Sequence, residues 1–236
     1  MLVFDVSAYN TGDLPPCDGL IARTTTKDGK IDHLFEYWYN HARYHNLPFG
    51  AYKYTYATSS VFAEVESISV AKLLQGVKLS LGFWLDCETS ELRNGSDSVL
   101  KSIIEEYKET MNLFKIPWGG IYCDANFYYH HEDVLVNEKI WLARWTNGIN
   151  AKPIMYNNPN VVGWQYTNKY NGKNLDASLW KTPEKEQAQD ENKVLYNPDN
   201  VRLLQEYLNK HYGYQLKVDG VMGTKTFTAI CQSLAK

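Results

Sequence analysis

The sequence lacks an excess of basic residues, because 24 lysines and arginines stand against 27 aspartates and glutamates, a formal net charge of −3. Proteins that bind nucleic acids or anionic membranes electrostatically normally carry a basic face, so the composition argues against both classes. No apolar run approaches the roughly 20 residues that a membrane-spanning helix needs. The first ten residues, MLVFDVSAYN, contain no basic segment and reach an acid at Asp5. We therefore expect no signal peptide and a protein made in the cytoplasm.

Paired cysteines and clusters of metal ligands are also missing. The four cysteines form no CxxC pair and stand at no zinc-ligand spacing with a histidine, so we interpret them as reduced thiols. His41 and His45 stand four residues apart, which leaves a metal site conceivable, but a solvated helix face explains the spacing better. We predict no metal and no cofactor.

Short aromatic and β-branched runs, bounded by Gly, Pro, Asn or Asp, predict eight strands in the first 180 residues. They span residues 2–6, 19–25, 49–57, 82–88, 119–124, 139–145, 152–156 and 161–167. Amphipathic patterns predict helices over residues 31–46, 60–75 and 97–114. This alternation indicates a mostly parallel sheet. Because the gaps after residue 139 are too short for crossover helices, we predict an α/β fold, an irregular TIM-like β/α barrel that ends in bare strands.

The composition changes near residue 181. Residues 181–193 are charged and nearly free of apolar side chains, which is typical of a linker. Beyond them, residues 199–212 and 224–235 have the apolar spacing of amphipathic helices. We predict a catalytic barrel over residues 1–180, a linker over 181–195 and a small helical module over 196–236.

Two carboxylates define the candidate active site. Asp86 and Glu88 stand two residues apart in the predicted strand 82–88, so both side chains point to one face. Carboxyl groups this close do not both ionise easily, and a raised pKa suits general acid catalysis near neutral pH. Asp5 lies near the end of the first strand and Asp176 follows the last one, so a closed barrel gathers four acids at its mouth. Such a group suggests hydrolysis of a glycosidic bond.

The order of the motifs resembles glycoside hydrolase family 25, the Chalaropsis-type lysozymes, many of which are phage endolysins. The segments that carry the resemblance follow one another over residues 1–180 as DVSAYN, GAYKYTYA, LDCE, GIYCD, WLARW, GWQYTN and LDAS. The resemblance implies an irregular barrel and retaining cleavage, in bacterial peptidoglycan, of the β-1,4 bond between N-acetylmuramic acid and N-acetylglucosamine. It also implies an endolysin that reaches the cell wall after a holin opens the membrane.

The resemblance further implies roles for single residues. Glu88 would be the general acid and base, and Asp86 would be either the covalent nucleophile or the stabiliser of an oxazolinium formed by the substrate's acetamido group. Asp5 and Asp176 would orient groups and adjust proton affinity. The residues that match the family's glycan-binding groove are Arg23, Tyr52, Tyr54, Tyr122, Trp145 and Gln165.

One position departs from the family pattern. Lys53 stands where the family commonly has histidine, between two aromatic residues. Strand alternation places it on the opposite face from the flanking tyrosines, so we expect little effect on the chemistry.

The C-terminal segment NVRLLQEYLNKHYGYQLKVDGVMGTKTFTAI resembles the peptidoglycan-binding domains of wall hydrolases. Val218-Asp219-Gly220 and Gly223-Thr224 match the motif of that family, in which Asp-Gly suits a turn and the threonine suits a helix N-cap. This copy is short. Whether it binds the wall or mediates oligomerisation, and what the oligomeric state is, stay open.

The residues leave an alternative class open, a barrel that binds wall glycan without cutting it. The complete acid set argues against it, since a non-catalytic relative is expected to have lost Asp86 or Glu88. A family 18 chitinase needs a D-x-x-D-x-D-x-E run, which is missing because Phe83 and Trp84 precede Asp86. An amidase or peptidase would need zinc ligands or a Cys/His pair, for which the sequence carries no signature.

Overall fold

The computed structural model describes residues 1–146, 152–181, 198–221, 225, 226, 228, 229 and 233. The chain divides into two compact units, Met1–Glu184 and Lys185–Lys236. The predicted linker over 181–195 lies outside the described residues except for Lys181. Gly223, Thr224 and most of the predicted helix over 224–235 also lie outside them.

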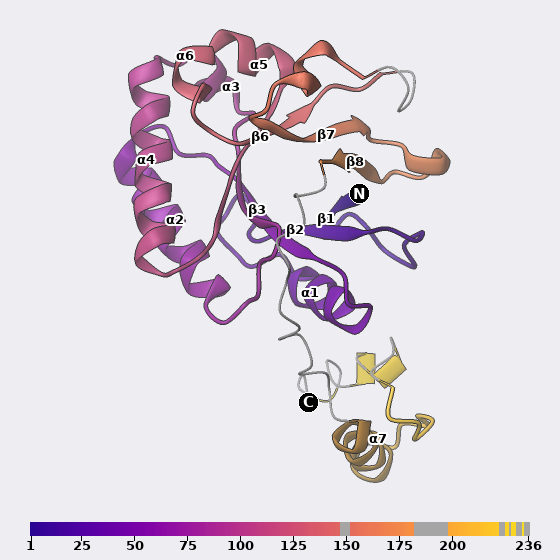
Figure 1. Ribbon diagram of the computed structural model, residues 1–236. Helices are drawn as coiled ribbons and strands as arrows, with labels where there is room; N and C mark the ends of the chain where they lie inside the picture. Colours follow the sequence, from indigo (N-terminus) through magenta and orange to yellow (C-terminus); the bar gives the residue numbers. More distant parts are fainter. Residues whose placement is uncertain (147–151, 182–197, 222–224, 227, 230–232, 234–236) are drawn as a thin grey trace. The chain divides into compact units, whose positions relative to one another are not determined.

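Eight strands close into a barrel in chain order, from β1 to β8 (Figure 1). The strands are β1 Leu2–Val6, β2 Gly19–Arg23, β3 Phe49–Tyr54, β4 Gly82–Asp86, β5 Trp118–Asp124, β6 Ile140–Ala143, β7 Val161–Thr167 and β8 Asp176–Trp180. Neighbours from β1 to β7 pair in parallel, and β8 closes the barrel by running antiparallel to both β7 and β1. The predicted irregular α/β barrel is therefore confirmed.

The three predicted helices are present as α1 (Phe35–Tyr44), α2 (Ser60–Leu74) and α4 (Asp97–Leu113). Helices α2 and α4 pack side by side and cover one flank of the barrel (Figure 1). The shorter helices are α3 Ser90–Arg93, α5 Ala125–His130, α6 Glu132–Leu135, and the 3-10 turns η1 Ile154–Asn157 and η2 Tyr170–Gly172. In the described part of the chain after β6 and before β8, η1 and η2 are the only helical segments, as predicted for bare late strands. Among the described residues, no helix combines the length and the hydrophobicity that a membrane span requires.

One predicted strand is wrong, and one strand was missed. Residues 152–156 were expected to form a strand, but the chain turns there into η1, since Pro153 has no N–H to donate and its carbonyl accepts the N–H of Tyr156. The eighth strand is β8, in the segment predicted to follow the last strand. Asp176 and Ser178 of β8 point into the barrel, so the inward face of this strand is polar and lacks the apolar alternation that predicts a strand.

The barrel interior is apolar at one end and polar at the other. Trp84, Trp141 and Trp180 pack together near the ends where β1 and β4 begin, with ring centroids 5.0–6.0 Å apart. Trp84 lies edge to face with both of the others, and Trp141 is tilted against Trp180. The indole N–H groups of Trp84 and Trp141 donate to the Leu81 carbonyl and to Ser178 Oγ. This tryptophan layer fills the barrel, so the polar residues above it line a closed-bottomed mouth.

Gly120 of β5 marks a place in the barrel wall that tolerates no side chain. Its φ is +140°, and a Cβ atom there would lie 2.1 Å from the carbonyl oxygen of Lys139. We expect Gly120→Ala to lower the free energy of unfolding by about 2–4 kcal/mol, measured by urea unfolding. Gly12→Ala is the matched control, because Gly12 also has a positive φ, +91°, but has no atom within 4 Å of the added Cβ. Equal losses in both variants would contradict the steric explanation.

The C-terminal unit is organised around Gln205 of α7 (Pro198–Tyr212). The Gln205 amide nitrogen lies 3.0 Å from each of three acceptors, Asp219 Oδ1, the Val221 carbonyl and Thr226 Oγ1. Its amide oxygen accepts from the backbone N–H groups of Asp219 and Gly220. A buried glutamine with its hydrogen-bonding capacity used in this way fixes the turn at Asp219-Gly220 against the helix.

Candidate functional site

A cleft of about 570 Å³ opens over the carboxyl ends of the parallel strands. All four predicted acids line it, namely Asp5, Asp86, Glu88 and Asp176. The predicted glycan-binding residues that also line it are Arg23, Tyr52, Tyr54, Tyr122 and Trp145. The structure therefore brings together, at one mouth, side chains from β1 to β5, from β8, and from the segments that follow β4 and β6.

Asp5 and Asp176 form a carboxyl pair across the barrel seam. They stand opposite each other in the antiparallel pairing of β1 with β8, and their side chains share a hydrogen bond. Burial raises the pKa of Asp5 well above its ordinary value, and the nearby Asp176 raises it further. Burial also raises the pKa of Asp176. Sharing one proton between the two carboxyl groups is therefore favourable.

Asp86 is the last residue of β4 and is buried at the floor of the cleft. Its Oδ1 atom has no hydrogen-bond partner within the described residues. Burial raises the pKa of Asp86 well above its ordinary value, and the charges of Glu88 and Asp5 raise it further, while Lys53 opposes the rise. This oxygen is shielded from solvent, so no hydrogen bond of the described residues stabilises the ionised form of Asp86 at this atom.

Glu88 lies two residues beyond the end of β4, so the predicted strand over 82–88 is too long by two residues. It is half-buried and still lines the same cleft as Asp86. Burial raises the pKa of Glu88 to about 7, and Asp124 contributes further to the rise, while Arg93 opposes it. At neutral pH this carboxyl is therefore protonated in a large share of molecules.

An ion pair that the sequence interpretation did not identify stands beside Glu88. Arg93 of α3 and Asp124 at the end of β5 form a two-pronged pair, with Nη2–Oδ2 at 2.5 Å and Nη1–Oδ1 at 3.2 Å. Asp124 also caps α5 by accepting the N–H of Phe127. The position of Asp124 at a strand end, in the motif GIYCD, was the signal that could have found it.

Gln165 of β7 is not brought to the cleft surface. Its side chain is 1% exposed and its amide oxygen accepts from the Tyr122 hydroxyl at 3.0 Å and from the Trp145 indole N–H at 2.9 Å. Its amide nitrogen donates to Asp5 Oδ2 at 3.2 Å. Gln165 therefore orients three residues of the site from beneath. Trp145, by contrast, is 59% exposed, and its ring stands at the rim.

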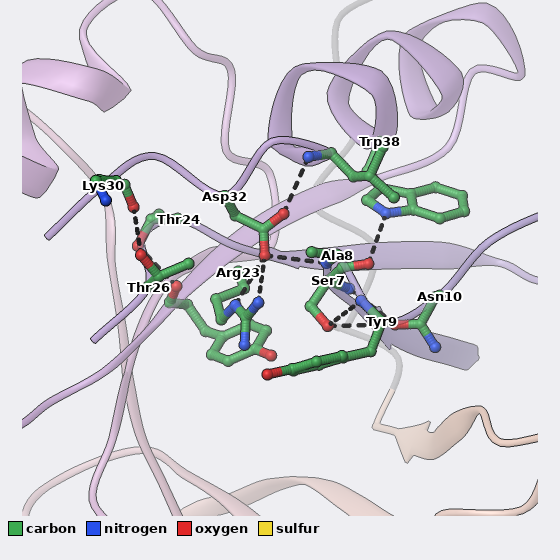
Figure 2. Close-up of polar contacts among 12 residues, drawn as sticks. Ser7, Ala8, Tyr9, Asn10, Arg23, Thr24, Thr26, Lys30, Asp32 and Trp38 are labelled. Carbon is green, nitrogen blue, oxygen red and sulfur yellow. Dashed lines mark hydrogen bonds and ion pairs between the residues drawn. The ribbon is translucent and has the colours of Figure 1, made fainter. Parts of the chain in front are cut away.

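Arg23 is held at the end of β2 by a buried acid. Its Nε and Nη2 atoms lie 2.8 and 2.7 Å from Asp32 Oδ2, and the same oxygen accepts the N–H of Ala8 (Figure 2). The ring of Tyr9 lies 4.9 Å from the Arg23 guanidinium carbon and is 81% exposed. Tyr9 and Asp32 were not singled out from the sequence, although Tyr9 belongs to the motif DVSAYN.

Lys53 faces away from the cleft, as predicted from strand alternation. It is 2% exposed, and its ammonium lies 3.8 Å from Glu66 of α2 and 3.5 Å from the Thr26 carbonyl. It still acts on the site at longer range, because its charge opposes the rise in the pKa of Asp86.

The described residues contain no group of three or more His, Cys, Asp or Glu side chains that could hold a metal ion. His41 of α1 and His45, the residue that follows α1, are neighbours with ring centroids 4.4 Å apart. The groups that the cleft offers to a ligand are carboxyl, hydroxyl and amide groups, aromatic rings, the Arg23 guanidinium and the Lys27 ammonium.

Comparison with known proteins shows which family model the sequence of the chain matches. Residues 5–175 match the family model of the glycosyl hydrolases family 25. No curated protein sequence matches the chain.

Three solved structures share the fold at low identity. The modular autolysin LytC from Streptococcus pneumoniae has a TM-score of 0.62 and 22% identity, over 76% of this chain and 46% of that one, so this chain spans less than half of its length. The catalytic domain of endolysin ply40 from bacteriophage P40 of Listeria monocytogenes has a TM-score of 0.58 and 17% identity, over 77% and 93%. A muramidase from Acremonium alcalophilum has a TM-score of 0.55 and 19% identity, over 78% and 95%.

Proposed function

This chain belongs to the glycosyl hydrolases family 25, and on that premise we propose that it is an endolysin-type lysozyme, an N-acetylmuramidase that hydrolyses bacterial peptidoglycan. The observation that carries the proposal is the cleft in which four carboxyl groups with raised pKa values meet beside tyrosine and tryptophan rings. Pairs of carboxyl groups flank the scissile bond in most glycoside hydrolases, and flat rings with polar edges suit sugar faces. A muramidase and a phage endolysin share the fold, which supports the substrate class.

Glu88 is the proposed general acid and base. A carboxyl with a pKa of about 7 can give its proton to the glycosidic oxygen and take one from water afterwards. Asp86 then stabilises the positive charge that develops on the sugar, either by forming a covalent bond or by stabilising an oxazolinium made by the substrate's acetamido group. Positive charge next to Asp86 favours its ionised form, which counteracts the effect of burial. Both routes retain the configuration at the anomeric carbon.

The remaining acids support this chemistry. Asp5 and Asp176 share a hydrogen bond, so they can keep a proton within the site while Asp86 is charged. Gln165 fixes one oxygen of Asp5, and the Arg93–Asp124 pair fixes the charges beside Glu88. These residues position and tune the two proposed catalytic groups.

The rate should depend on pH in a bell-shaped manner. We expect kcat on soluble peptidoglycan fragments to fall as the pH rises above about 7, because Glu88 then loses the proton that it must donate. On the acid side kcat should fall as Asp86 is protonated. Because the acids of the cleft titrate as a coupled group, neither limb of the profile gives the pKa of a single residue.

Arg93→Met should move the alkaline limb of this pH profile to higher pH, because Arg93 is the cation that lowers the pKa of Glu88. A shift of that limb to lower pH would contradict the assignment.

The identity of the new reducing end tests the proposed bond specificity. Purified peptidoglycan is digested with the wild-type protein, reduced with borohydride and analysed by mass spectrometry. A muramidase gives fragments that end in reduced muramic acid. Fragments that end in reduced glucosamine would instead make the protein a glucosaminidase, and wall binding without new reducing ends would favour the alternative of a glycan-binding barrel.

The C-terminal unit is proposed to attach the enzyme to the wall. Its support is the Gln205-centred turn at Asp219-Gly220, which lies in the segment that resembles peptidoglycan-binding domains. We also propose that the protein acts on the cell wall after holin-type release, by analogy with the endolysin that shares its fold.

A further inference from the structure

A second cavity, of about 610 Å³, opens beside the acid cleft. Five of its six lining residues also line the cleft, so it is a side arm of the cleft rather than a separate pocket. The six residues of this side arm are Tyr9, Arg23, Thr26, Lys27, Asp28 and Tyr56. They belong to the end of β2 and to the segments after β1, β2 and β3, whereas Glu88 follows β4.

The side arm is preorganised by hydrogen bonds. Figure 2 shows Tyr9, Arg23 and Thr26 within this network. The turn that carries Lys27 is closed by the backbone N–H and hydroxyl of Thr26, which both donate to the Lys30 carbonyl, at 2.8 and 3.1 Å. The exposed ring of Tyr9 packs against Arg23, which Asp32 holds from below. A ligand that enters the side arm therefore meets walls that are already in place.

The charges of the side arm leave one cation available. Asp32 balances Arg23, and Lys30 balances Asp28 at a distance of 2.7 Å. Lys27 is exposed and has no carboxylate within ion-pair distance among the described residues, and its ammonium lies 5.1 Å from the centre of the Tyr56 ring. An anion can therefore bind Lys27 without displacing an existing ion pair.

The acid cleft and its side arm have opposite electrostatic preferences. The cleft offers a ligand carboxylate acids that repel it when they are ionised, while Lys27 and the Arg23 guanidinium in the side arm attract it. A glycan that carries a carboxylate on a substituent is thus oriented with the substituent in the side arm and the sugar over the acids. The tyrosine rings give the substituent a partly apolar surface.

We propose that the side arm binds the carboxylate-bearing substituent of the muramic acid ring, with Lys27 as its principal ionic contact. This inference rests on the proposed function, because it assumes a peptidoglycan substrate. The carboxylate has two possible sources, the free lactyl group of a glycan stripped of peptide or an acidic residue of the attached peptide. Both sources present a carboxylate group, and the side arm binds this group in either case.

Steady-state kinetics of Lys27→Met tests the proposal with three soluble substrates: peptide-bearing glycan, glycan stripped by an amidase, and stripped glycan whose carboxyl groups are converted to amides. For the wild type, amidation should raise KM about three- to tenfold, the effect of one partly exposed ion pair. Lys27→Met should raise KM on the carboxylate substrates by the same factor, with kcat within about twofold, and should no longer discriminate against the amide. Lys101→Met is the matched control, since Lys101 carries the same charge at an exposed position on α4 but lines neither the side arm nor the cleft.

Each outcome separates the alternatives. If Lys27→Met raises KM on stripped glycan, the bound carboxylate is that of the lactyl group. If it raises KM only on peptide-bearing glycan, the bound carboxylate is that of the peptide. Either result supports the proposed role of the side arm. Unchanged KM on all three substrates, or an equal rise with Lys101→Met, would overturn it while leaving the proposed function standing. A wild-type protein that releases no reducing ends from any substrate would overturn the proposed function itself.

Discussion

Replacing Glu88 with glutamine is expected to lower kcat on peptidoglycan by about 10²–10⁴-fold, the usual contribution of a positioned general acid. Glutamine keeps the shape of the side chain but has no proton to donate at neutral pH. The loss should be smaller on an aryl glycoside with a good leaving group, because such a group departs without full protonation. Measuring both substrates distinguishes loss of the acid from general damage to the site.

The fold of this variant is expected to be intact. Burial raises the pKa of Glu88 from 4.5 to about 7, so this carboxyl stabilises the folded state fully below about pH 4.5, and that contribution is lost as the pH rises through about 7. Near neutral pH, Glu88→Gln removes an ionisation that the folded state disfavours, and its melting temperature should equal or exceed that of the wild type. Glu91→Gln, at an exposed position on α3, is the matched control and should keep wild-type activity. Full activity in folded Glu88→Gln would refute the assigned role.

Asp86→Asn is expected to lower kcat by about 10³-fold, because it removes the negative charge nearest to the developing positive charge of the sugar. Asparagine has nearly the same volume, so the tryptophan layer beneath should not change. The variant should also be more stable than the wild type at neutral pH, since burial raises the pKa of Asp86 well above its ordinary value. Asp133→Asn, at an exposed position on α6, is the control. An Asp86→Asn variant with more than about a tenth of wild-type kcat would contradict a central electrostatic role.

A modified substrate separates the two possible roles of Asp86. If the acetamido group at carbon 2 is replaced by a hydroxyl, no oxazolinium can form, and only a covalent bond to Asp86 preserves the retaining route. Turnover of that substrate by the wild type, together with its loss in Asp86→Asn, would favour the covalent nucleophile. Loss of turnover already in the wild type would favour participation of the acetamido group.

The site residues that could be predicted from the sequence are those that lie together in one short motif. Asp86 and Glu88 stand together at a strand end, so local alternation was enough to bring them to one cleft. Asp5 was found because an acid after a buried run is conspicuous. The strand β8 could not be found in this way, since its inward residues Asp176 and Ser178 are polar and hide the apolar alternation that marks a strand.

The parts that escaped prediction depend on contacts between distant segments. The Arg93–Asp124 pair joins α3 to the end of β5. Asp124 is marked in the sequence only by its place at a strand end, and nothing in the sequence shows that Arg93 stands beside Glu88. Gln165 matched a groove position by sequence, but the folded barrel buries it beneath Tyr122 and Trp145. Local periodicity specifies which face of a strand a residue occupies, but it does not specify how deep in the barrel the residue lies.

The central claim is that this cleft hydrolyses the glycan of peptidoglycan with Glu88 as the proton donor. The most direct test is mass spectrometry of borohydride-reduced peptidoglycan digests, with the wild type beside Glu88→Gln at equal concentration of folded protein. The account predicts fragments that end in reduced muramic acid with the wild type and their near absence with the variant. Equal amounts of these fragments from both proteins, or none from the wild type, would contradict it.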